Sequence, residues 1–376
     1  MHLAFVTPYD PDDLRAFAGI PHFVARTLRE RVDRLSVVGP LPYGGRVAGR
    51  VAKLRHRSRG ESYSRAHTWA GVRGLAEAAG PQLRALRPDA VLSPSTLPLA
   101  ALDVDCPTAS WADATFEANL LFYPGFTDFA EAHVVEAHAV ERAALHRATA
   151  SVFASAYAAD SAAGYYGADP VHVVPFGANL DPADVPSADA VSDAVATRSR
   201  DEVRLLFVGG GWYRKGGDVA LRVAEEMTAR GVPTTLTVAG PVPPTESPLL
   251  RAEGFLRKEV PAERDRLRRL FAESHFLCMP VRAEDFGCVF AEAAAFGVPS
   301  ASSRVGGVPS AVADGVSGVL FDVRERPGVL ADRLLALWAD ADVYRALAAS
   351  ARDHYERTLN WGVAVDRVLD VLRAHL

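Results

Sequence analysis

The chain has 376 residues, of which 49% are hydrophobic and 23% are charged, and its formal net charge at pH 7 is -5. A chain of this length exceeds the size that one hydrophobic core usually serves, so two domains are expected. The acidic balance argues against general nucleic-acid binding, which normally requires a strongly basic domain. We therefore expect small-molecule partners and no nucleic acid.

The N-terminal sequence and the cysteines bear on the compartment. MHLAFVTPYD has no basic segment before an apolar run, and no window approaches the roughly 18 uncharged apolar residues that a membrane span needs. Cys106, Cys278 and Cys288 form no CxxC pair, so neither a disulfide framework nor a zinc site is predicted. These features favour a cytoplasmic protein without a metal.

Short apolar runs alternate with longer segments of helical period in the first half of the chain. The runs lie at 3–6, 35–39, 90–93 and 151–155. Alternation of this kind predicts parallel strands joined by helices, which is the α/β class. The first domain is expected to span 1–178.

The stretch 45–60, GRVAGRVAKLRHRSRG, is strongly basic and carries Val47, Val51 and Leu54 at helical spacing. It predicts a basic amphipathic helix. One interpretation is a solvated face near the opening for an acceptor, which we favour here. The other is a weak peripheral contact with anionic lipid, which would weaken with salt.

A second α/β pattern begins further along, with apolar runs at 203–210, 234–240, 275–280 and 298–303. The segment 179–202 between the two patterns is rich in Asp, Ala, Ser and Pro, and we interpret it as an exposed interdomain linker. The second domain is expected to span 203–356. The helical segment 357–376 can pack on either domain, including back on the first.

The stretch LLFVGGGWYRKGGDV has the composition of a phosphate-binding loop. It does not match the Walker pattern, because no Ser or Thr follows Lys215, and it lacks the last glycine of GxGxxG, where Arg214 stands. What remains is two adjacent cations at a strand-to-helix turn, which suit a diphosphate leaving group. The alternative is a solvent-exposed basic turn.

The stretch EDFGCVFAEAAAFG places Glu284 after a strand and turn, and Glu292 in the first turns of a helix that follows Gly287. Backbone N–H groups at such a helix start bind phosphate, and carboxylates accept hydrogen bonds from sugar hydroxyls. The alternative makes Glu292 an ordinary charged helix residue and Glu284 a solvated loop residue.

Taken together, GGGWYRKGG, EDFGCVFAEAAAFG and GGVPSAVADGVSGVLF resemble the retaining glycosyltransferases of family 4. In the first half, FAGIPHFVARTL, WADATF and HVVPFGANLD resemble segments of one branch of that family. The resemblance covers most of the chain. It implies the GT-B fold, in which two Rossmann-like domains face each other across a cleft.

The resemblance also implies roles for particular residues. Glu284 would contact the donor sugar, Glu292 would hold the ribose hydroxyls and Lys215 would bind the diphosphate. The backbone at 286–288 would meet the sugar or phosphate, the turn at 254–256 would flank the base, and residue 19 would lie near the phosphates and acceptor. The implied donor-binding residues are Glu292, Gly210, Gly211, Phe286, Gly287, Cys288, Val289, Phe255, Leu256 and Gly19.

The sequence departs from the family pattern at two positions. Many relatives carry an arginine five residues before the lysine, where this chain has Gly210, and Arg214 is the candidate substitute. A histidine often stands on the acceptor side, where this chain has Asp113. Asp113 could orient the acceptor hydroxyl or the sugar, or it could cap the next helix, since Asp is a strong N-cap.

The expected reaction is retaining, metal-independent transfer of a hexosyl group from a nucleotide sugar to a hydroxyl of a small-molecule, glycan or glycolipid acceptor. UDP is the nucleotide that family frequency favours, with GDP and TDP open, and no cofactor is expected. The alternative is a sugar-nucleotide epimerase or hydrolase on the same fold. An epimerase would need acid and base groups around the sugar carbon, and we identify no such set.

Overall fold

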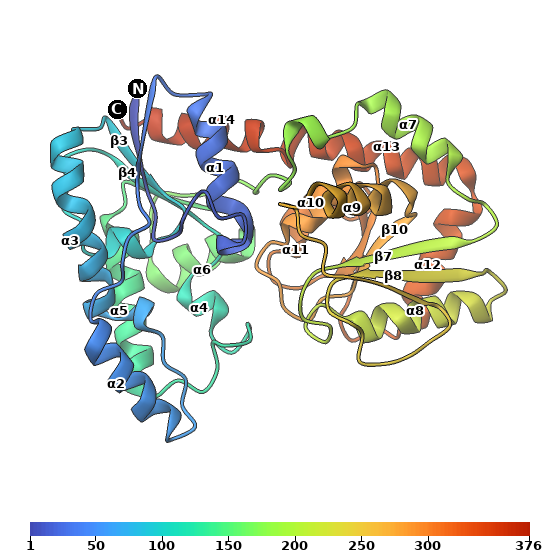
Figure 1. The fold of residues 1–376 in the computed structure, drawn as a ribbon, viewed down its shortest axis with the longest axis horizontal. Coiled ribbons are helices and arrows are strands. Elements are labelled where there is room, and N and C mark those ends of the chain that lie inside the picture. Colours follow the sequence, from blue (N-terminus) through green and yellow to red (C-terminus); the bar gives the residue numbers. More distant parts are fainter. The chain divides into compact units, whose positions relative to one another are not determined.

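The computed structural model describes residues 1–376, which divide into two compact units. Unit 1 comprises Met1–Pro175 together with Trp361–Leu376, and unit 2 comprises Phe176–Asn360. Each unit is a parallel sheet flanked by helices (Figure 1). No helix is both long enough and apolar enough to cross a membrane.

The sheet of unit 1 has six parallel strands in the order β2-β1-β3-β4-β5-β6. The predicted strands in this half are confirmed as β1, β2, β3 and β5, whereas β4 and β6 were not predicted. The strands are β1 (His2–Val6), β2 (Arg34–Val38), β3 (Ala90–Ser93), β4 (Thr108–Ala112), β5 (Ala150–Phe153) and β6 (Val171–Val173). The α-helices are α1 (Ile20–Arg29), α2 (Arg46–Arg57), α3 (Trp69–Leu86), α4 (Phe116–Asn119), α5 (Glu131–Arg147), α6 (Ala156–Tyr166) and α14 (Trp361–Arg373).

The sheet of unit 2 also has six parallel strands, in the order β12-β11-β10-β7-β8-β9. The predicted strands are confirmed as β7, β8, β10 and β11, and β9 and β12 are additional. The strands are β7 (Val203–Val208), β8 (Thr234–Ala239), β9 (Leu250–Gly254), β10 (Phe276–Met279), β11 (Ser300–Ser303) and β12 (Gly318–Phe321). The α-helices are α7 (Ala188–Thr197), α8 (Gly217–Ala229), α9 (Pro261–Glu273), α10 (Cys288–Ala295), α11 (Val308–Ala311), α12 (Pro327–Ala339) and α13 (Ala341–Thr358).

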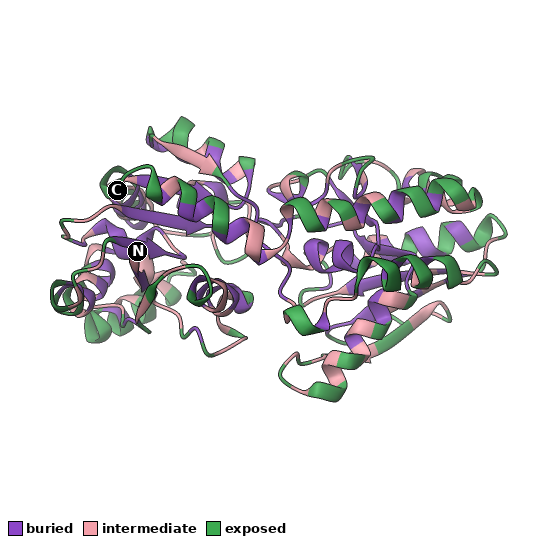
Figure 2. Ribbon diagram, turned by 90° about the horizontal axis from the view of Figure 1, so that it is seen from above, coloured by how far each residue is buried: buried purple, intermediate pink, exposed green.

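The core of each unit lies on its central strands. Every residue of β3, β4, β5, β10 and β11 is buried, because helices cover both faces of a parallel sheet. The edge strands β2, β6 and β9 keep partly exposed residues. In Figure 2 the buried residues accordingly gather on the strands and on the inner helix faces.

Each sheet has one point where the strand order reverses. In unit 1 the chain passes from β1 outward to β2 and then returns to β3 on the other side of β1. In unit 2 it passes from β7 outward through β8 and β9 and returns to β10 on the other side of β7. The loops that leave two such strands diverge and form the crevice where α/β proteins bind ligands.

The segment 179–202 is not the exposed linker that we predicted, because it folds as part of unit 2. It contains a short 3₁₀ helix, Pro182–Asp184, and then α7. The hydroxyl of Ser187 caps α7 by accepting from the Ala190 N–H at 3.2 Å. Val191 and Val195 are the buried side of the helix.

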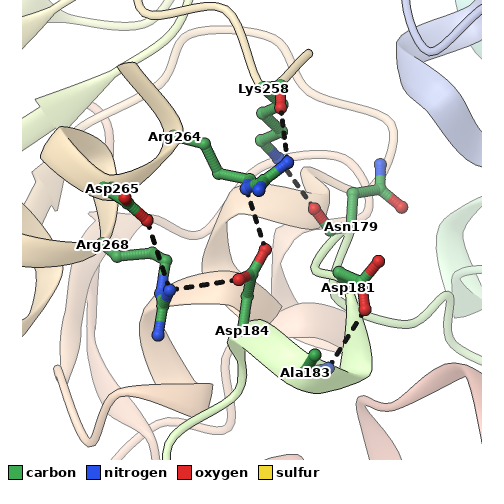
Figure 3. A network of polar contacts seen from close by, with 8 residues as sticks. All are labelled: Asn179, Asp181, Ala183, Asp184, Lys258, Arg264, Asp265 and Arg268. Carbon is green, nitrogen blue, oxygen red and sulfur yellow. Dashed lines mark hydrogen bonds and ion pairs between the residues drawn. The ribbon is translucent and has the colours of Figure 1, made fainter. Parts of the chain in front are cut away.

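Ion pairs with α9 hold the same segment in place. Figure 3 shows Asp184 between Arg264 and Arg268, each with a nitrogen 3.1 Å from a carboxylate oxygen of Asp184. Nearby, the Lys258 ammonium donates to the Asn179 carbonyl oxygen at 3.0 Å. Ion pairing of Asp184 therefore ties this segment to unit 2, and the boundary lies at Pro175.

The last helix, α14, belongs to unit 1 and begins at Trp361, because α13 continues to Thr358 in unit 2. The Trp361 ring meets the Trp111 ring edge-on, with centroids 5.6 Å apart. The buried face of α14 is aliphatic and is formed by Ala364, Val365, Val368, Leu369 and Leu372. The chain thus returns to its first unit at its end.

Candidate functional site

The turn between β7 and α8 requires glycine at several positions. Gly209, Gly211 and Gly216 all have positive φ angles, of 133°, 87° and 76°. A Cβ on Gly216 would lie 1.9 Å from the Pro280 carbonyl oxygen, so no side chain is tolerated there. The backbone of this turn therefore packs directly on the loop after β10, which is the other side of the reversal point in the sheet.

Arg214 and Lys215 converge on one carboxylate. The Arg214 Nη1 lies 3.2 Å and the Lys215 Nζ 3.1 Å from the same oxygen of Glu284. The side chains of Arg214, Lys215 and Glu284 are only 19%, 13% and 10% exposed. The interpretations of a solvent-exposed basic turn and of a solvated Glu284 are therefore wrong.

Further contacts tie the two loops together. Arg214 Nη1 donates to the Ala283 carbonyl oxygen at 2.8 Å, and the Arg282 N–H donates to the Arg214 carbonyl oxygen at 2.8 Å. The Arg282 guanidinium also makes two 2.8 Å hydrogen bonds to the Asp218 carboxylate, and these lower the pKa of Asp218. These hydrogen bonds, including the bidentate pair between Arg282 and Asp218, order the turn that carries Arg214 and Lys215 without the need for a ligand.

Helix α10 starts beside Glu284. Its N-cap is Gly287, with a φ of 84°, and a Cβ there would meet the Phe290 ring at 2.7 Å and the Glu284 side chain at 3.2 Å. Gly287, Cys288 and Val289 are partly exposed, whereas the Phe286 side chain is buried. The exposed part of Gly287 is backbone, because glycine has no side chain, and the helix dipole favours an anion at this helix start.

Glu292 lies one turn further along α10 and is buried. It pairs with Lys258, whose Nζ is 2.5 Å from a carboxylate oxygen of Glu292 and also binds the Asn179 carbonyl. Glu292 was predicted from the sequence, whereas its neighbours Lys258 and Asn179 were not. The only feature of the sequence that indicated Lys258 as a partner of Glu292 was its position as a cation shortly after Phe255.

The other predicted donor-binding positions line the same end of the unit 2 sheet. Phe255 is 69% exposed and Leu256 is half-buried on the turn after β9. Gly210 and Gly211 are exposed, and a Cβ on Gly210 would meet nothing within 4 Å. Gly210 thus leaves open the position where many family relatives carry arginine.

Two predicted residues belong to unit 1, at the carboxyl end of its sheet. Asp113 directly follows β4, and it is Thr115 that caps α4, since its hydroxyl accepts from the Ala118 N–H at 3.1 Å. Asp113 is therefore not the N-cap. Burial raises the pKa of Tyr9, and the nearby Tyr43 and Asp113 raise it further.

Gly19 is the buried N-cap of α1, with a φ of 84°. It ends a loop from β1 in which Phe17 and Ala18 also have positive φ angles. The Phe17 ring stacks on the Tyr9 ring with centroids 4.8 Å apart. Consecutive non-glycine residues in this region of φ cost energy, and such strain is concentrated at functional loops.

Known proteins resemble this chain in sequence. The model of a family described as glycosyl transferases group 1 matches residues 202–340. The chain is 32% identical over 222 residues to D-inositol 3-phosphate glycosyltransferase of Xylanimonas cellulosilytica, covering 55% of this chain and 52% of the relative. The enzyme of that name from Nocardiopsis dassonvillei is 34% identical over 185 residues, covering 45% and 42%. The chain thus spans about half the length of these relatives.

Solved structures share the fold over the whole chain. Sucrose-phosphate synthase from Thermosynechococcus elongatus has a TM-score of 0.68 at 17% identity, covering 100% of this chain and 99% of that one. HepE of Anabaena in complex with UDP and glucose has a TM-score of 0.64 at 15% identity, covering 100% of both chains. The fold is GT-B, as the resemblance implied.

Proposed function

We propose that this chain, whose residues 202–340 form a glycosyl transferases group 1 domain, transfers a hexosyl group from a nucleoside diphosphate sugar to an acceptor hydroxyl. The observation that carries the proposal is the convergence of Arg214 and Lys215 on Glu284, beside the start of α10 and at the reversal point of the sheet. A diphosphate suits this position, because two cations and the positive end of a helix dipole there would stabilise its negative charge.

The donor is proposed to lie across unit 2. Its diphosphate would contact Lys215, Arg214 and the backbone at 287–289, and its ribose hydroxyls would donate to Glu292 in exchange for the contact with Lys258. Phe255, exposed on a neighbouring turn, offers a ring against which a base can stack. We propose UDP as the nucleotide, which HepE of Anabaena also binds.

The proposed reaction retains the configuration of the anomeric carbon. The bond between that carbon and the diphosphate oxygen breaks, and the acceptor oxygen bonds to the same carbon from the same face. The acceptor proton passes to an oxygen of the departing diphosphate, so no protein base is required. Arg214 and Lys215 would stabilise the departing oxygens without a metal, and Asp113 would orient the acceptor hydroxyl or the sugar.

Calorimetry without added metal tests the donor site. The wild type should bind UDP more tightly than GDP, TDP or NAD, and both Glu292→Ala and Lys215→Ala should weaken binding by about tenfold or more, as expected for the loss of a charge-assisted contact. Arg222→Ala is a matched control, since Arg222 is exposed on α8. Binding of NAD alone, or of no nucleotide, would refute the proposal.

The stereochemistry and the acceptor need a separate measurement. Incubation with UDP-glucose and a panel of hydroxyl acceptors, followed by NMR of the product, should give an α-linked sugar if the configuration of the donor is retained. A β-linked product would contradict the retaining mechanism. Free glucose or an epimerised sugar nucleotide as the main product would instead support the hydrolase or epimerase alternative.

A further inference from the structure

Helix α2, Arg46–Arg57, has its apolar side chains on the outside. Val47, Val51 and Leu54 are 77%, 65% and 72% exposed. Their spacing of four and three residues places them in one row along the helix. An ordinary surface helix turns such a row toward the core.

The opposite side of α2 is the one that packs on unit 1. Gly49 is buried, and a Cβ there would lie 2.8 Å from the Arg65 side chain. His56, two turns further along, binds Glu61 at 2.7 Å and stacks on the Tyr63 ring at 5.3 Å. At 3.6 residues per turn, Gly49 and His56 lie about half a turn away from the apolar row. The aliphatic row therefore has no partner within unit 1.

The charges on α2 are of one sign. Six cations and no carboxylate occur within 45–60, in a chain whose net charge is -5. Arg46, Arg50, Lys53 and Arg57 follow one another at helical spacing beside the apolar row, and Arg55 lies on its other side. The fold thus presents aliphatic side chains between two cationic borders.

We propose that α2 docks unit 1 on an anionic lipid bilayer, with Val47, Val51 and Leu54 inserted at the headgroup boundary and the flanking arginines on the lipid phosphates. An interfacial helix combines these two features. Neither a nucleic acid nor an acidic protein surface accounts for the aliphatic row as well. Protein interfaces are typically anchored by aromatic side chains, and α2 carries no Phe, Tyr or Trp.

Vesicle co-sedimentation of the full chain tests this proposal. The wild type should bind vesicles of phosphatidylcholine with about one third phosphatidylglycerol, should bind phosphatidylcholine alone much more weakly, and should be released by high salt. The variant Arg46→Gln/Arg50→Gln should lower the partition constant by about fivefold for each arginine removed. The control Arg222→Gln/Arg324→Gln removes two exposed cations of unit 2 and should bind as the wild type does.

The variant Val47→Ser/Val51→Ser/Leu54→Ser tests the apolar row and should lower the partition constant by about tenfold or more. Because all three side chains are exposed, the variant should fold, and an unchanged circular dichroism spectrum and thermal unfolding curve of the full chain serve as the check. Absence of binding to anionic vesicles, or equal binding by this variant and the wild type, would overturn the proposal. If the control Arg222→Gln/Arg324→Gln lost as much vesicle binding as Arg46→Gln/Arg50→Gln, binding would depend only on net charge. That result would also overturn the proposal.

Discussion

Replacing Glu284 by Gln should lower the stability of unit 2 but strengthen its binding of UDP. Both effects are expected at Arg214 and Lys215, in the turn between β7 and α8. In the unliganded chain, one carboxylate oxygen neutralises Arg214 and Lys215 at 3.2 and 3.1 Å. Removing one partner of a largely buried ion pair costs about 3 kcal/mol or somewhat more. For a unit of this size, about 3 kcal/mol lowers the Tm of unit 2 by roughly 6 to 12 °C.

The same substitution should strengthen binding of UDP. A diphosphate must compete with Glu284 for both cations in the wild type, whereas in Glu284→Gln it meets them unpaired. We expect the Kd for UDP to fall by about tenfold, which corresponds to about 1.4 kcal/mol, while transfer of the sugar is lost. UDP should then raise the Tm of the variant by more than it raises that of the wild type.

Calorimetric titration and thermal unfolding with and without UDP measure these effects. Glu225→Gln, an exposed carboxylate on α8, is the matched control and should change neither quantity. Glu292→Gln should have the opposite effect on UDP, because it removes the proposed acceptor for the ribose hydroxyls. An unchanged Tm in Glu284→Gln, or weaker UDP binding, would refute the view that the carboxylate and the diphosphate compete for one cationic pair.

Three further outcomes are expected. Gly216→Ala should destabilise unit 2 by about 2 kcal/mol or more, because the φ of 76° and the Pro280 carbonyl both exclude a Cβ. The control Gly164→Ala should not destabilise the chain, because the space around a Cβ at that position is open, and urea unfolding measures both variants. Burial raises the pKa of Glu141 from 4.5 to about 7. Its folded pKa is the higher one, so its contribution to stability is full below pH 4.5 and is lost as the pH rises through 7, by about 3 kcal/mol. Glu141→Gln should flatten this decline in unfolding curves at pH 5 and pH 8, and an unchanged pH profile would contradict it. Asp113→Asn should leave the Tm and the Kd for UDP unchanged and lower kcat/KM for transfer by about tenfold or more, and full activity would exclude a role at the acceptor.

Periodicity alone predicted the class of the fold but not the exposure of every element. Val47, Val51 and Leu54 indicated an amphipathic helix, and α2 is one, yet its packed side is formed by Gly49 and His56. Sequence spacing identifies a row of side chains, and only the packing partner decides which row is buried. Of the four strands that were missed, the edge strands β6 and β9 are partly exposed and lack a continuous apolar run.

The linker was misplaced for a related reason. A segment rich in Asp and Ala has the composition of a loop, but Asp184 is paired with Arg264 and Arg268, which lie about eighty residues away in sequence. Val191 and Val195, four residues apart after Ser187, were the local sign of α7. Long-range ion pairs of this kind leave no pattern in a single sequence.

More of the donor site than of the acceptor side could be predicted from the sequence. The reason is the order of the strands in each sheet. The loops after β7 and β10 are about seventy residues apart in sequence, yet these strands are adjacent at the reversal point, so parallel winding alone brings Lys215 to Glu284. Each loop also carries glycine, at 216 and 287, where backbone approach excludes a side chain, and glycine is visible in sequence. In unit 1 the reversal lies between β1 and β3, whereas Asp113 follows β4, one strand further out. Its surroundings therefore depend on the length and course of the loop from β1, which carries Tyr9, and winding does not determine these.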